Sequence, residues 1–229
     1  MRREGADTMG ENARSGEVLP EILPVFPLSG VLLLPGAELP LHIFEPRYRA
    51  MTRDALEGPG LIGLIQPRAN SDATPDNPRP EIYPTGCMGR ITECRQTEDG
   101  RYHMTLIGIC RFRIHEELPL LNGYRRVSPN YAPFMDDLAQ GRDGRVDRDR
   151  LSGALAAYCA KRNFTANWDA IKQISDERLI SSLAMLCPFE ASEKQALLEA
   201  ANLTERSRVV IALLEMALLE SGESRPVKH

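Results

Sequence analysis

Lysine is scarce in this chain. None of the lysines follows a glycine; they are Lys161, Lys172, Lys194 and Lys228. A phosphate-binding P-loop needs the pattern GxxxxGKS or GxxxxGKT, whose lysine contacts the nucleotide phosphates. The sequence therefore excludes a P-loop ATPase. The patterns GxSxG and HExxH, which mark a serine-hydrolase nucleophile and a zinc peptidase helix, are absent as well.

Cysteines are few and do not follow a ligand or disulfide pattern. Their number is odd and no CxxC spacing occurs; they are Cys87, Cys94, Cys110, Cys159 and Cys187. A disulfide framework and a zinc ribbon are therefore not expected. The first residues contain no apolar stretch typical of a secretory signal, and no apolar run approaches the roughly 18 residues of a membrane span. We expect a soluble cytoplasmic protein with reduced thiols and no membrane contact.

An excess of positive charge is also missing. The formal net charge is -4, and the hydrophobic fraction of 42% is enough for a core. Residues 22–134 contain 12 arginines against 12 acidic residues, and residues 146–221 contain 9 basic and 11 acidic residues. Nucleic-acid binding needs clustered lysine and arginine, so neither part predicts a nucleic-acid partner.

Short apolar runs dominate residues 23–66. Residues 23–26 and 61–66 read as strands, and the second of these is apolar enough to be buried. Residues 38–44 alternate, with Leu39, Leu41 and Ile43 on one face. Pro40 lacks an N–H group, so this strand is predicted at a sheet edge or a bulge. Pro46 suits the first position of a helix, whose apolar stripe is predicted from Tyr48, Met51, Ala55 and Leu56.

A long hairpin is predicted over residues 86–114. The dipeptide Asp99-Gly100 favours a type I′ turn, since both central residues tolerate positive φ. The returning strand is predicted to place one set of apolar residues on a single face: Tyr102, Met104, Leu106, Cys110, Phe112 and Ile114. Residues 124–131 read as a further strand that completes the β-rich part.

Helical spacing replaces strand patterns from about residue 146. Apolar stripes occur on successive segments: Leu151, Leu155, Tyr158 and Cys159; Trp168, Ile171 and Ile174; Leu179, Leu183 and Leu186; Val209, Val210, Leu213, Leu214 and Ala217. Trp168 is interpreted as a core anchor. Ser192 with Gln195 resembles a capping box, and Thr204 is the predicted cap of the last helix.

Strands and helices are thus segregated along the chain, which predicts an α+β fold. We expect a disordered arm over residues 1–21, a β-rich lobe over 22–134, a polar linker over 135–145, a helical lobe over 146–220 and a tail over 221–229. Residues 67–80, which hold four prolines, read as an exposed loop. Met1 and Met9 both remain open as the start of translation.

Candidate chemistry is sparse. GPGLIG (residues 58–63) matches the letters GxGxxG, but it follows a helix and precedes a strand, the reverse of a dinucleotide site. Cys110 falls on an apolar strand face, where a cysteine acts as a small hydrophobe, although a pair with His103 or His115 stays open. His42 and Glu45 are too few ligands for zinc. No catalytic residue, metal or cofactor is predicted.

Residues 23–49 resemble the start of the N-terminal substrate-recognition domain of Lon-type ATP-dependent proteases. The order is a strand like PLFPL, an apolar run, Pro-Gly, a second apolar run and a helix. The segment LPLHIFEPRYR (residues 39–49) is similar in sequence to the small stand-alone bacterial members of the family. Further similar segments are residues 61–66, 85–91, 106–112 and 193–199 with Arg206. The resemblance implies a PUA-like β pseudo-barrel followed by an α-helical bundle.

The resemblance also implies a module that binds unfolded or specific protein substrates, with a protease or chaperone as a further partner. The sequence contains neither the ATPase nor the Ser–Lys peptidase module, so we expect no enzymatic activity. Two alternatives stay open: an RNA-binding PUA-like protein, and a small-molecule or enzymatic pocket using Cys110, His42 or His103. The candidate interaction surface comprises His42, Phe44, Glu45, Arg47 and Arg49. The sequence does not determine the oligomeric state.

Overall fold

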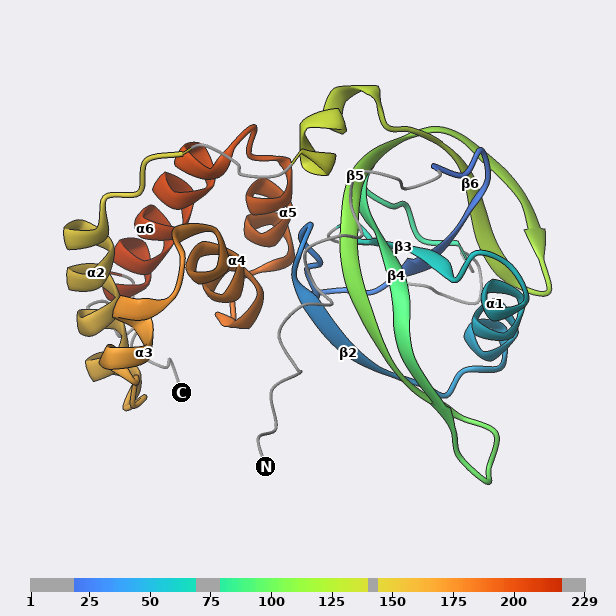
Figure 1. Cartoon of the computed structure of the whole chain (residues 1–229), viewed down its shortest axis with the longest axis horizontal. Helices are drawn as coiled ribbons and strands as arrows, with labels where there is room; N and C mark the ends of the chain where they lie inside the picture. Colours follow the sequence, from blue (N-terminus) through green and yellow to red (C-terminus); the bar gives the residue numbers. More distant parts are fainter. Residues whose placement is uncertain (1–18, 69–78, 140–143, 220–229) are drawn as a thin grey trace, which may run out of the picture.

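The computed structural model describes residues 19–68, 79–139 and 144–219 (Figure 1). The predicted tail, both candidate start methionines and nearly all of the predicted N-terminal arm lie outside these residues. So do most of the proline-rich loop and part of the predicted linker. Within the described residues, six strands come first and six of the seven helices follow the last strand. The predicted α+β class is confirmed.

The β lobe is one mixed sheet with the strand order β2-β5-β4-β3-β1-β6. β6 also pairs with β5, so five of the strands close into a ring, and β2 lies at the edge beside β5. The helix α1 (Pro46–Glu57) lies against this lobe (Figure 1). The strands are β1 (Leu23–Pro27), β2 (Glu38–Ile43), β3 (Leu61–Ile65), β4 (Thr85–Gln96), β5 (Tyr102–Leu121) and β6 (Tyr124–Asn130).

The helical lobe follows a short 3-10 helix, η1 (Ala132–Leu138). Its longest helices, α2 and α6, pack side by side, and α5 lies nearest the sheet (Figure 1). The helices are α2 (Arg148–Arg162), α3 (Trp168–Gln173), α4 (Asp176–Leu186), α5 (Ala191–Glu199) and α6 (Leu203–Leu219).

Several local predictions are confirmed. β2 is an edge strand and contains Pro40, as the missing N–H group required. Its odd-numbered residues face inward and its even-numbered ones outward. α1 begins at Pro46, and all of β3 is buried. Leu56, however, was wrongly assigned to the buried stripe of α1, since its side chain is exposed.

The turn of the β4–β5 hairpin differs from the predicted type I′. Only Gly100 has a positive φ, of 77°, whereas type I′ requires positive φ at Asp99 as well. The Gly100 N–H donates to the Thr97 carbonyl at 2.8 Å. This is the geometry of a type I turn followed by a left-handed glycine, which also matches the twist of a hairpin.

The prediction that the apolar residues of β5 share one face is wrong. Opposite β4, Met88 pairs with Cys110 but the next residue pairs with Gly108, so Ile109 is a bulge. A bulge shifts the alternation by one residue. Met104 and Leu106 therefore join one core cluster, while Ile109, Cys110 and Phe112 join another.

Some helical predictions are wrong because exposure depends on neighbouring helices. Trp168, interpreted as a core anchor, is 37% exposed, and Leu186 is 82% exposed. The cap of α5 is formed by Glu193, which accepts from the N–H of Glu190, rather than by Ser192 with Gln195. Asn202, not Thr204, accepts the capping hydrogen bond of α6, from the N–H of Glu205. The predicted stripe of α2 is confirmed as buried.

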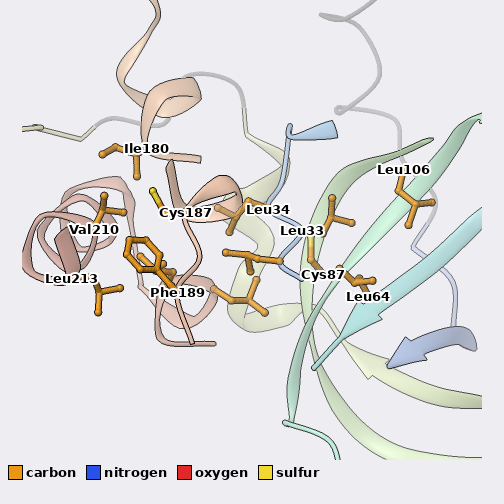
Figure 2. Close-up of a cluster of buried hydrophobic side chains, with 14 of the residues drawn as sticks. Leu33, Leu34, Leu64, Cys87, Leu106, Ile180, Cys187, Phe189, Val210 and Leu213 are labelled. Atoms are coloured by element: carbon orange, nitrogen blue, oxygen red, sulfur yellow. The ribbon is translucent and has the colours of Figure 1, made fainter. Parts of the chain in front are cut away.

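The two lobes share one hydrophobic core (Figure 2). The loop that follows β1 carries Leu33 and Leu34 between the sheet and the helices, so it forms the centre of this junction. Gly108 allows the close approach, because a Cβ atom there would collide with the Leu34 carbonyl. The labelled side chains on the sheet side are Leu64, Cys87 and Leu106. Those on the side of the helical lobe are Ile180, Cys187, Phe189, Val210 and Leu213.

A buried ion pair adds a polar link at the same junction. Arg111 on β5 is 5% exposed and Asp137 on η1 is 1% exposed. The Arg111 Nε and Nη2 atoms donate to the two Asp137 oxygens at 2.8 and 2.9 Å. Its Nη1 atom donates to the Leu198 and Ala200 carbonyls, at 3.0 and 2.7 Å. Arg111 thereby satisfies carbonyls at the end of α5, which a helix leaves without internal partners.

Other polar side chains secure the first half of α5 to the sheet. Gln66 donates to the Ala191 carbonyl at 3.0 Å, and Gln195 donates to the Thr85 carbonyl at 3.1 Å. The Lys194 ammonium donates to the Gly30 carbonyl at 2.8 Å, and burial lowers its pKa from the ordinary value. We call this whole set the interlobe seam: Gln66, Arg111, Asp137, Lys194 and Gln195.

Candidate interaction surface

Three aromatic side chains form an exposed row beside the free edge of the sheet. His42 on β2 lies opposite His103 on β5, and their rings stack with centroids 4.5 Å apart and planes 8° apart. Phe44, just after β2, continues the row, with its ring 5.8 Å from that of His42. The Phe44 side chain is 57% exposed. We call Phe44, His42 and His103 the aromatic row.

The first hollow lies beside the aromatic row and has a volume of about 480 Å³. It crosses three neighbouring strands, because Arg95 on β4 lies opposite His103, and Glu93 lies opposite Thr105. A positive and a negative side chain therefore lie next to the aromatic rings. The lining residues are Pro40, Leu41, His42, Glu93, Cys94, Arg95, His103, Met104 and Thr105.

The second hollow lies between α1 and the tip of the β4–β5 hairpin and has a volume of about 540 Å³. Arg49 and Arg53 reach it from α1, while Gln96 and Tyr102 reach it from the hairpin, where they are a cross-strand pair. The remaining lining residues are Pro46, Ala50 and Gly100.

The structure separates the five candidate surface residues into three groups. His42 and Phe44 meet in the aromatic row. Arg49 lines the second hollow. Glu45 and Arg47 form an ion pair at 2.9 Å, and the Arg47 guanidinium lies 4.6 Å from the centre of the Tyr48 ring. The charges of Glu45 and Arg47 are thus mutually compensated.

Sequence reasoning missed most of the residues that line the two hollows, including Glu93, Arg95, Arg53 and Gln96. The missing signal was the cross-strand register. Counting back from the hairpin turn places Arg95 opposite His103 and Gln96 opposite Tyr102. That count requires the correct turn geometry, which the predicted type I′ turn did not provide.

The described residues do not bring together a Cys–His pair at Cys110. This thiol is fully buried, and it donates to the Arg111 and Phe134 carbonyls at 3.2 and 3.4 Å. His103 instead stacks on His42. Cys94 lines the first hollow, but burial raises the pKa of its thiol, which disfavours the reactive thiolate.

The described residues were also searched for metal and membrane features. They contain no group of three or more His, Cys, Asp or Glu side chains that could hold a metal ion. Over the same ranges, every helix is too short or too polar to cross a bilayer.

The fold defines an α+β protein in which a ring of strands precedes a helical lobe, and solved structures share it. A Lon N-terminal domain protein from Xanthomonas campestris has a TM-score of 0.57 and 22% identity, covering 83% of this chain and 97% of that chain. The N-terminal domain of a Mycobacterium avium complex Lon protease has a TM-score of 0.60 and 17% identity, covering 85% and 98%.

The chain belongs to the family described as the ATP-dependent protease La (LON) substrate-binding domain, whose model matches residues 22–216. The predicted family resemblance is confirmed. Lon protease 2 of Myxococcus xanthus is 24% identical over 202 residues, covering 86% of this chain and 24% of the relative. Lon protease 2 of Thermus thermophilus is 27% identical over 213 residues, covering 89% and 25%. The chain thus spans about a quarter of the length of these curated relatives.

Proposed function

We propose that this chain is a non-catalytic module that binds extended segments of unfolded or specific proteins along β2 and the aromatic row. The carrying observation is the exposed row of Phe44, His42 and His103 beside an edge strand. Membership of a substrate-binding domain family supports a polypeptide as the ligand. In this proposal residues 22–134 bind the segment. The helical lobe, residues 146–220, packs against them and supports them.

An edge strand can bind a polypeptide through its main chain. Within the described residues β2 pairs only with β5, so its other side offers backbone groups for an added strand. Main-chain hydrogen bonds tolerate many sequences, while pockets for alternate side chains provide selectivity. The aromatic row and the first hollow supply such a pocket on one face of β2.

The same proposal includes the compartment in which the module acts and the proteins with which it acts. The five cysteines are free thiols, which suits the reducing cytoplasm. The related full-length proteins are named Lon proteases, so we propose that the bound segment is passed to a protease or a chaperone.

The test uses a fluorescently labelled, permanently unfolded protein, such as reduced and carboxymethylated lactalbumin, in an anisotropy titration. The variant Phe44→Ser with His103→Ser should bind about tenfold more weakly, because losing two exposed aromatic contacts at about 0.7 kcal/mol each amounts to about 1.4 kcal/mol. Phe164→Ser is the matched control: Phe164 is 55% exposed, as Phe44 is 57% exposed, but it lies in the helical lobe. It should bind as the wild type does.

Two results would contradict the proposal. One is equal binding by the wild type and the Phe44→Ser, His103→Ser variant. The other is tighter binding of a structured RNA than of the unfolded protein, which would favour the RNA-binding alternative.

A further inference from the structure

The second hollow combines two arginines on one face of a helix. Arg49 and Arg53 are one turn apart on α1, a spacing at which like charges repel. The Arg49 guanidinium lies directly over Gly100, and any Cβ atom at that position would collide with its Nη2 atom. The Arg49 guanidinium thus lies against the hairpin turn, where the positive φ of 77° itself favours glycine at position 100.

Two of the carboxylates near the second hollow already have other partners. Asp99 pairs with Arg101 of its own turn at 2.9 Å. Asp54 accepts from Arg53 at 3.2 Å, and also from Asn122 and Tyr124 at 2.8 and 3.0 Å.

Arg49 is left uncompensated by these pairs. Among the residues that the structure describes, none forms an ion pair with it. The hollow therefore carries surplus positive charge, and the Gln96 amide and the Tyr102 hydroxyl add further hydrogen-bonding groups.

We propose that the second hollow binds an acidic side chain of the polypeptide that lies along β2. This rests on the proposed function, because it assumes a segment beside the aromatic row. β2 ends at Ile43, Phe44 follows it in the row, and Pro46 already lines the second hollow. A segment that runs along this edge thus leads to Arg49. A guanidinium matches a carboxylate through two parallel N–H···O bonds, which gives selectivity as well as affinity.

The experiment compares two short fluorescein-labelled peptides with the same alternating apolar stretch. One carries glutamates at both ends of the stretch and the other carries glutamines, so the comparison does not depend on the direction of binding. The binding of each peptide to the wild type is compared with its binding to a double variant that carries Arg49→Gln and Arg53→Gln. Arg208→Gln is the matched control, because Arg208 is an exposed arginine on α6.

We expect the wild type and Arg208→Gln to prefer the glutamate peptide by about threefold to fivefold, as one charge pair with Arg49 would give. The double variant should lose this preference while it still binds the glutamine peptide. The preference should also shrink as salt is raised, because exposed charges are screened.

Each contrary result has a separate meaning. Equal binding of the two peptides to the wild type overturns this inference alone. Binding of neither peptide overturns the proposed function and this inference together. If inorganic phosphate binds the wild type but not the double variant, and no peptide preference exists, the hollow is a phosphate site and the inference is overturned.

Discussion

The strand β5 carries one polar side chain that is buried between the lobes and another that is exposed to solvent. Arg111 lies in the interlobe seam, where its donors meet the Asp137 carboxylate and two carbonyls at the end of α5. His103 lies on the same strand in the exposed aromatic row, where it stacks on His42. The seam uses its polar groups internally, whereas the row and the second hollow present theirs to solvent.

The comparison shows how a charged residue can be assigned to structure or to binding. A buried charge must be paired and hydrogen-bonded, so a fully satisfied pair such as Arg111–Asp137 has nothing left for a ligand. Arg49 is half-buried and forms no ion pair with any residue that the structure describes, so its guanidinium remains available. The helix α1, which carries Arg49, lies on the side of the β lobe away from the helical lobe (Figure 1).

The largest expected effect is in the seam. Arg111→Met should lower the free energy of unfolding by about 3–5 kcal/mol, because it removes the guanidinium that pairs with the buried Asp137 carboxylate. Urea denaturation measures this loss. Arg113→Met is the control: this arginine is exposed on the same strand, and a change of about 0.5 kcal/mol or less is expected.

A double variant sharpens the same comparison. Adding Asp137→Leu to Arg111→Met also removes the buried Asp137 carboxylate, so part of the lost stability should return. Equal losses for Arg111→Met and Arg113→Met would mean that the seam does not stabilise the junction, and the division between structural and available charges would fail.

An intermediate effect is expected at the start of α5, which the seam holds against the sheet. Glu193→Ala should cost about 1 kcal/mol, because the Glu190 N–H loses its acceptor at 2.7 Å. The neighbouring Ser192→Ala should be close to neutral, since Ser192 is exposed and outside the observed capping box. Thermal unfolding of the two variants decides between the observed cap and the one predicted from sequence.

The smallest effect is confined to alkaline pH. Burial, together with its hydrogen bond to Asp54, raises the pKa of Tyr124 from 10.0 to about 12. The folded protein then holds this proton more tightly than the unfolded chain does. The associated stability is complete below about pH 10 and is lost as the pH rises towards about 12.

Tyr124→Phe should therefore show a shallower loss of stability between about pH 10 and 12 than the wild type, in urea denaturation at several pH values. Some slope should remain, because burial also raises the pKa of Tyr131. Parallel curves for the two proteins would contradict the assignment, and would leave Tyr124 with no electrostatic role beside α1.

Predictions that depend on a few neighbouring residues agree with the structure. The edge position of Pro40, the start of α1 at Pro46 and the buried strand β3 each follow from local backbone chemistry or apolar spacing. Predictions that depend on register failed. The bulge at Ile109 divides the apolar residues of β5 between two clusters, and the hairpin turn differs from type I′.

The sequence by itself determined the α+β class, the family resemblance and the edge strand, because periodicity and the missing N–H of proline act over short distances. Only the tertiary structure decided which charges are satisfied and which are free. Asp137, the buried partner of Arg111, lay in a predicted linker. The burial of this pair depends on groups far apart in the chain, and such pairings form only when the whole chain folds.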